Sequence, residues 1–227
     1  MFPAFWDVFT PEYLLYFLRG AAISLGIACI SVLVGLVLGV IACAGKMCKN
    51  KFANVIANIY VEFIRGTPLM VQILFLFSVI PALYTAVTGN VFRMNAYLVG
   101  IIALSINSGA YSTELIRSGI NSIDKGQWEA CETLGLSYFQ TMRFVVLPQA
   151  FKVVIPPIIS EFITLIKDSS LIASIGAVEL LKSAQVVGAK FYEVMSPYCI
   201  ILVYYLIMTV SISYIGKYIE RKLAESD

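Results

Sequence analysis

The sequence contains no histidine, and charged residues make up only 13% of its 227 residues. Its five cysteines include no pair at the spacing of metal ligands, so we interpret them as small apolar packing residues. A net charge of +2 without a basic tract argues against a nucleic-acid partner. Without histidine, metal-ligand spacing or a nucleophile beside a base, an enzyme has little support. We therefore expect no catalytic residue and no metal site.

A nucleotide-binding loop is also missing. Residues 39–46 resemble a phosphate-binding loop, but five residues separate Gly39 from Gly45 where four are required. Met47 stands where such a loop needs Ser or Thr. We therefore expect the chain to bind no cofactor, so that any ATP-driven work falls to a partner.

Apolar residues are abundant, at 59% of the chain. Four stretches of about 20 to 27 residues carry no charge, and each is long enough for a helix to cross roughly 30 Å of hydrocarbon. A fifth apolar stretch contains a few charged residues. The stretches are residues 20–45, 66–92, 94–113, 153–178 and 194–216. The sequence predicts an all-α membrane protein with about five transmembrane helices, formed by residues 1–227 as a single domain.

Basic residues cluster after the first apolar stretch, around residues 119–150, and after the last stretch. They are Lys46, Lys49, Lys51, Arg117, Lys125, Arg143, Lys152, Lys217, Arg221 and Lys222. The positive-inside rule then predicts an outside N-terminus and a cytoplasmic C-terminus. It also places residues 119–150, which we call the polar insert, in the cytoplasm.

The polar insert has the pattern of two short helices. Asp124 with Gln127, and Ser137 with Gln140, have the spacing of capping boxes that start helices. Gly135 can adopt the left-handed conformation that ends the first helix. Pro148 is expected to limit the second helix. Such a compact helix–turn–helix between membrane spans is typical of a docking surface.

Polar groups at membrane depth are costly, which makes each of them a candidate functional residue. In the second span a helical face carries Glu62, Arg65 and Gln72, and Pro68 interrupts the helix beside Thr67. Broken helices with polar groups at the break commonly line substrate sites. Arg65, Thr67 and Gln72 are the candidates here; alternatively, Glu62 and Arg65 simply pair at the end of the span.

The third span has two polar faces. Asn107 and Tyr111 share one face and are candidates for contact with a substrate. The other face carries small residues at a spacing that allows close helix packing. These residues are Ser105, Ser108 and Ser112.

The fourth span carries Glu161, Thr164 and Asp168 on one stripe. A carboxylate suits an ammonium group, and the guanidinium of Arg65 suits a carboxylate. Together Arg65 and Glu161 describe a site for the α-carboxylate and α-ammonium of a zwitterion, with Thr164 beside them. The alternative is an internal ion-pair network that joins Arg65 and Glu161 with Glu62 and Lys167.

Four segments together resemble a known family. They are GQWEACETLG followed by LPQA (residues 126–135 and 147–150), EFIRGTPLMVQ (62–72), SGAY with Glu114 and Arg117 (108–111), and LIKDSSL (165–171). The first resembles the EAA coupling loop of permease subunits of ABC importers. The others resemble the subfamily that imports polar amino acids, the histidine/glutamine/arginine type. The resemblance extends over roughly residues 13–222.

The resemblance implies a type I ABC importer permease fold in the bacterial inner membrane, with cytoplasmic EAA coupling helices. The implied partners are a second permease subunit, a dimer of cytosolic ATPases that binds ATP and magnesium, and an extracellular solute-binding protein. The implied substrate is a polar L-amino acid, and Glu161 with Asp168 is expected to favour a cationic or neutral side chain. The implied ATPase-coupling residues are Glu129, Ala130, Leu134, Gly135 and Leu136. Trp128 is bulky for the motif and is expected to add an apolar anchor at that interface.

Two other functions remain open. An ion-coupled secondary transporter would use Glu161, Lys167 and Asp168 as a relay, but it has no need of the polar insert and commonly shows an inverted repeat that this sequence lacks. A permease-like receptor would keep the insert without transport. Whether two copies pair or a related subunit completes the pore is also open.

Overall fold

The computed structural model describes residues 8–225, and within that range every regular element is helical. The helices are α2 (Pro11–Met47), α3 (Lys51–Gly66), α4 (Leu69–Leu74), η1 (Phe75–Val79), α5 (Ile80–Thr88), α6 (Ala96–Asn121), α7 (Lys125–Thr133), α8 (Tyr138–Thr141), η2 (Met142–Val146), α9 (Leu147–Asp168), η3 (Ser169–Ile175), α10 (Leu180–Phe191) and α11 (Met195–Ala224). The predicted all-α fold is therefore confirmed.

Four helical segments of the described chain are long and apolar enough to cross a membrane. They are Pro11–Met47, Leu69–Thr88, Tyr138–Ile175 and Met195–Leu223. Helix α6 occupies the remaining expected span, and its 26 residues extend over about 39 Å. It is less apolar because Asn107 and several serines are buried along it.

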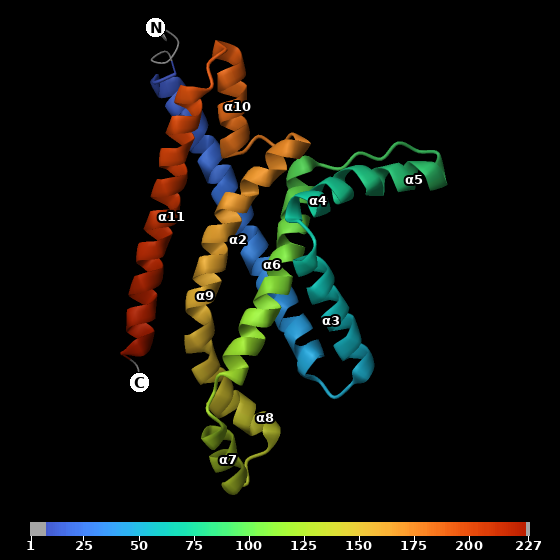
Figure 1. The fold of residues 1–227 in the computed structure, drawn as a ribbon, viewed down its shortest axis with the longest axis vertical. Coiled ribbons are helices and arrows are strands. Elements are labelled where there is room, and N and C mark those ends of the chain that lie inside the picture. The colour runs from blue at the N-terminus through green and yellow to red at the C-terminus, as the bar shows by residue number, and fades with distance from the viewer. Residues whose placement is uncertain (1–7, 226–227) are drawn as a thin grey trace.

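Helices α2 and α6 cross at the middle of the bundle and make the most extensive helix–helix contact (Figure 1). The approach is close because glycines of α2 face serines of α6. A Cβ atom at Gly35 would lie 2.7 Å from Cβ of Ser108, and one at Gly39 would lie 2.6 Å from Cβ of Ser112. The interpretation as packing residues is thus confirmed for Ser108 and Ser112.

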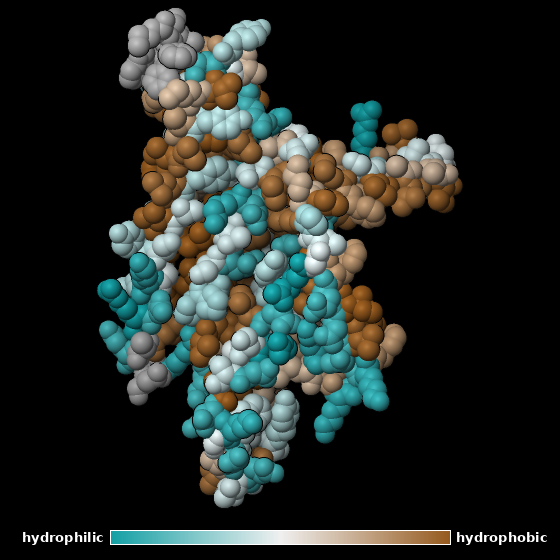
Figure 2. Space-filling view, viewed as in Figure 1, coloured by the Kyte–Doolittle hydropathy of each residue, from teal (hydrophilic) through white to brown (hydrophobic). Residues whose placement is uncertain are grey.

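The second span is broken between α3 and α4, at Pro68. Nε2 of Gln72 holds the break: it donates to the carbonyl of Ile64 (2.8 Å), the carbonyl of Thr67 (3.1 Å) and the Thr67 hydroxyl (2.8 Å). Beyond the break, α4, η1 and α5 form an arm that extends sideways from the bundle (Figure 1). The surface of this arm is largely apolar (Figure 2).

The polar insert lies at one end of the bundle, and α10 lies at the other end beside the start of α2 (Figure 1). Hydrophilic residues gather around the insert (Figure 2). The expectation that Pro148 limits the second helix is wrong. Helix α8 ends at Thr141, but the helical path continues through η2 into α9, with Pro148 in the first turn. Pro148 directly follows the π-helical turn η2, in which the amide of Leu147 donates to the carbonyl of Met142, and this locally wider turn accommodates a residue that cannot donate.

Candidate functional site

A cavity of about 540 Å³ opens where α3, α6 and α9 meet. This volume is within the range of about 300–1,000 Å³ that is usual for small-molecule pockets. We call it the α3–α6–α9 cavity. Its lining residues are Arg65, Gly66, Thr67, Pro68, Leu69, Asn107, Tyr111, Glu161, Thr164 and Asp168. Six of the seven candidate substrate residues from the sequence therefore lie around one cavity.

Gln72 is the seventh candidate, and it is not among the lining residues. Its amide nitrogen instead holds the break between α3 and α4, through the bonds to Ile64 and Thr67. Because Thr67 lines the cavity, Gln72 stabilises the cavity wall through its hydrogen bond to Thr67 without lining the cavity itself.

Arg65 and Tyr111 form the contact between the α3 and α6 walls. The guanidinium carbon of Arg65 lies 5.2 Å from the ring centroid of Tyr111, within cation–π range. Asn107, two helical turns before Glu114 on α6, is 7% exposed and adds a buried amide to the same wall. Within residues 8–225 no acceptor binds the guanidinium of Arg65, so its hydrogen-bond donors are available to an anionic group.

The α9 wall supplies the two carboxylates of the cavity, Glu161 and Asp168. Among residues 8–225, both ion pairs involve Glu114, which pairs with Lys46 and Arg117. The alternative network that would join Arg65 and Glu161 to Glu62 and Lys167 is therefore not formed. The cavity presents a guanidinium on one wall and two carboxylates on another, none of them neutralised by an ion pair within the described chain.

Four lining residues were not candidates from the sequence: Gly66, Pro68, Leu69 and Asp168. The first three belong to the break, and the Gly-Thr-Pro sequence was the signal that could have identified them. The sequence placed Asp168 on the same helical face as Glu161. A helical face alone does not show that the end of α9 lies near the break between α3 and α4.

The second candidate region is the polar insert, which is shaped by local capping. Asp124 caps α7 by accepting from the amide of Gly126 at 2.7 Å, but the reciprocal bond expected from Gln127 is not formed. Gln127 instead accepts from Nε2 of Gln149 at 3.4 Å. The predicted capping box between Ser137 and Gln140 is confirmed.

Gly135 ends α7 with a φ of 74°. Its amide donates to the carbonyl of Glu132 (2.9 Å), and the amide of Leu136 donates to the carbonyl of Cys131 (3.0 Å). This pair of bonds is a Schellman motif, in which a left-handed residue is required after the helix. The role predicted for Gly135 as a helix stop is therefore confirmed.

The candidate coupling residues differ in exposure. Glu129 and Ala130 are exposed, Leu134 is 78% exposed, and Leu136 is partly buried. Trp128 does not extend outward as an anchor. Its ring stacks on Tyr138 at 6.1 Å between centroids, and it packs against the apolar cluster at this end of the bundle. Leu134, the C-cap residue of α7, thus presents a large apolar side chain to solvent at the end of this helix.

Comparison with known proteins assigns the family. The model of the family described as "Binding-protein-dependent transport system inner membrane component" matches residues 31–225. The arginine transport system permease protein ArtQ of Bacillus subtilis is 37% identical over 93% of this chain and 94% of its own length. The glutamine transport system permease protein GlnP of Escherichia coli is 34% identical over 91% of this chain and 92% of its own length.

Solved structures agree with the sequence relatives. A chain in the crystal structure of an amino acid ABC transporter with histidines is 34% identical and has a TM-score of 0.86, with 93% of this chain and 95% of that chain covered. An inward-facing structure of the MetNI methionine ABC transporter has a TM-score of 0.77 at 19% identity, covering 94% of this chain and 99% of that chain. The expected ABC importer permease fold is confirmed.

Proposed function

Because the chain belongs to the family of inner membrane components of binding-protein-dependent transport systems, we propose that it is the permease subunit of an ABC importer for a polar L-amino acid. The similar proteins named for arginine and glutamine transport support this substrate class. The observation that carries the proposal is the α3–α6–α9 cavity, in which Arg65 and Glu161 face one space without an ion pair in the described chain.

An amino acid in this cavity has a partner for each charged end. The guanidinium of Arg65 binds the α-carboxylate through two parallel hydrogen bonds. Glu161 accepts from the α-ammonium group, and the Asn107 amide adds a neutral partner. Thr67, Tyr111 and Thr164 complete the polar lining. Asp168 favours a cationic or neutral polar side chain over an acidic one, because an acidic side chain would be repelled.

Energy comes from a separate ATPase dimer, which binds ATP and magnesium and docks on the polar insert. Glu129, Ala130, Leu134, Gly135 and Leu136 form the docking surface. The exposure of Leu134 and the tight turn at Gly135 support this role. With the basic residues of the insert in the cytoplasm, the N-terminus lies outside and the C-terminus inside.

Two further partners complete the transporter. A second permease subunit, identical or related, encloses the path, because the α3–α6–α9 cavity is open and the arm formed by α4, η1 and α5 is largely exposed within this chain. An extracellular solute-binding protein delivers the amino acid at the α10 end. Lipid covers the remaining apolar faces of the spans.

One alternative keeps the same cavity. An ion-coupled secondary transporter would use Glu161 and Asp168 as its coupling carboxylates. Neither carboxylate forms an ion pair within residues 8–225, which is the one observation that favours this alternative. It assigns no task to the polar insert and no partner to the exposed Leu134.

Transport assays in proteoliposomes separate the two candidates. The complex purified through a tag on this chain would be reconstituted with its solute-binding protein and supplied with labelled cationic, neutral or acidic amino acids. We expect uptake that requires ATP, with cationic or neutral polar amino acids preferred. Uptake that follows a sodium or proton gradient and ignores ATP would overturn the proposal.

A further inference from the structure

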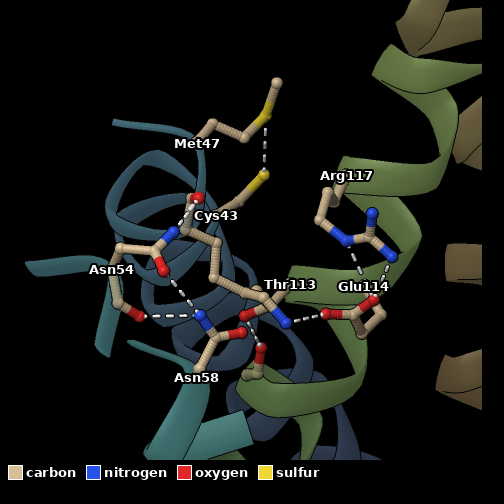
Figure 3. Close-up of polar contacts among 9 residues, drawn as sticks. Cys43, Met47, Asn54, Asn58, Thr113, Glu114 and Arg117 are labelled. Carbon is tan, nitrogen blue, oxygen red and sulfur yellow. Dashed lines mark hydrogen bonds and ion pairs between the residues drawn. The ribbon is translucent and has the colours of Figure 1, made fainter. Parts of the chain in front are cut away.

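Glu114 joins two cations near the end of α6 that leads to the polar insert. Its Oε1 lies 2.5 Å from Nζ of Lys46 on α2. Its Oε2 accepts from Nε (3.0 Å) and Nη2 (2.7 Å) of Arg117 (Figure 3). We call Lys46, Glu114 and Arg117 the charged triad. The side chains of Lys46 and Glu114 are 11% and 18% exposed, so water screens this pair little.

A third helix is attached to the same point. Nδ2 of Asn54 on α3 donates to the carbonyl of Lys46 at 2.5 Å, and Nδ2 of Asn58 donates to the carbonyl of Asn54 at 2.9 Å. Further along α3, the Tyr60 hydroxyl donates to the carbonyl of Ile106 on α6 at 2.7 Å. Polar contacts therefore link α2, α3 and α6 to one another between the cavity and the polar insert.

The charged triad lies between the two functional regions. Along α6, Glu114 is about 10 Å beyond Asn107, which lines the α3–α6–α9 cavity, and about 10 Å before Asn121, where α6 ends at the polar insert. The cavity residue Arg65 is on α3, which Asn54 links to Lys46. A displacement of the insert that travels along α6 passes through this level before it reaches Asn107 and Tyr111 of the cavity, whereas α9 connects the insert separately to the carboxylate wall.

The other side of α6 is also closely packed at this level. A Cβ atom at Gly119 would lie 2.1 Å from Cγ2 of Val154 on α9. Apolar packing can bring helices together, but it allows small sliding movements between them. A charged contact restricts such sliding, because an axial shift of a few ångströms would separate Lys46 from Glu114 and leave both charges poorly solvated.

We propose that the charged triad couples the polar insert to the α3–α6–α9 cavity, with Glu114 as the positioning residue. The contacts of Lys46 with Glu114 and Asn54 make α2, α3 and α6 move as one body when the insert moves. Arg65, Asn107 and Tyr111 then change position together, and each ATP cycle opens the cavity to the other side. This inference rests on the proposed function, since it requires an ATPase at the insert.

The test is the number of amino acids imported per ATP hydrolysed, measured in proteoliposomes with the whole complex. Glu114→Gln removes the charge at nearly constant shape, and Lys46→Gln breaks the same contact from α2. We expect both complexes to retain the ATPase and hydrolyse ATP, while import per ATP falls about tenfold. Lys49→Gln removes an exposed charge from the loop that follows α2, three residues after Lys46, and is expected to leave the ratio unchanged.

A ratio within twofold of the native value in either triad variant would overturn the proposal, even if import and hydrolysis both became slower, because a purely structural role changes the two rates together. If Glu114→Gln does not assemble, Lys46→Gln decides the question, since Glu114 there keeps its bonds to Arg117. Failure of the proposed function is a separate outcome: the native complex would then lack an ATPase or import without ATP.

Discussion

The α3–α6–α9 cavity draws its lining from three helices that are far apart in the sequence, whereas the polar insert is built from contacts between near neighbours. In the cavity, Arg65 meets Tyr111 across two helices. In the insert, the Gly135 turn and the Ser137–Gln140 capping box each close within a few residues. The two regions therefore depend on different interactions, and single substitutions should impair one of them while the other keeps working.

The largest effect is expected from Gly135→Asp. Its φ of 74° disfavours any residue with a Cβ atom by about 1 kcal/mol, and the new charge would lie where the ATPase docks. We expect the ATPase recovered with the purified permease to fall at least tenfold, while amino acid binding in the cavity persists.

Gly89→Asp is the matched control. Gly89 has a φ of 72° and nothing within 4 Å of its Cβ position, which are also the properties of Gly135, but it ends α5 on the arm. Equal loss of the ATPase from both variants would show that backbone strain, and not docking, causes the effect.

Arg65→Ala should give the next largest effect, and it acts on the opposite region. Loss of a hydrogen-bonded charge partner costs about 1.5–3 kcal/mol, which corresponds to a roughly 10- to 150-fold weaker binding of the amino acid. Arg65→Lys should recover only part of this affinity, because a lysine cannot form the two parallel bonds. Isothermal titration with the purified complex would measure both affinities.

Glu62→Gln provides the control for charge near the cavity. Glu62 is exposed on α3 and does not line the cavity, so its affinity change should be within twofold. If Arg65→Ala binds and imports the amino acid normally at low substrate, the carboxylate role of Arg65 is wrong.

A smaller effect is expected from Leu134→Ser. Leu134 is 78% exposed, so its removal should not change the thermal unfolding midpoint of the permease. Burial of a leucine in an interface contributes about 1.5–3 kcal/mol, and we expect ATPase affinity to fall accordingly by about tenfold or more. An unchanged affinity would remove Leu134 from the docking surface.

The smallest effect is expected from Cys131→Ala. Cys131 is 4% exposed and packs inside the polar insert, so the substitution leaves a small void that costs about 1 kcal/mol. ATPase recovery should be within twofold of the native value. A large loss would mean that the sulfur atom takes part in docking, which its burial argues against.

The same contrast explains what could be predicted from the sequence. The capping box of α8 and the turn at Gly135 depend on spacings of a few residues, so local rules identified them. The expectation for Pro148 was wrong because a π-helical turn such as η2, which precedes this proline and lets the helix continue past it, cannot be recognised from local residue spacing.

The cavity could be predicted only in outline. Helical faces identified Arg65, Asn107 and Glu161 as candidates, but a face does not show which neighbour it meets. The contact of Arg65 with Tyr111 and the inward turn of the Gln72 amide toward the helix break depend on how α3, α4 and α6 pack. Such packing depends on residues distant in sequence, including the glycines of α2 that allow α6 to approach closely.

The central claim is that one region binds the amino acid and the other binds the ATPase. The most direct test measures both properties on the same purified preparation, by quantifying the recovered ATPase and the bound labelled amino acid for Arg65→Ala and Gly135→Asp. Our account predicts that Arg65→Ala retains the ATPase and loses the amino acid, whereas Gly135→Asp loses the ATPase and retains the amino acid. Loss of both properties together in each variant, or of neither, would contradict it.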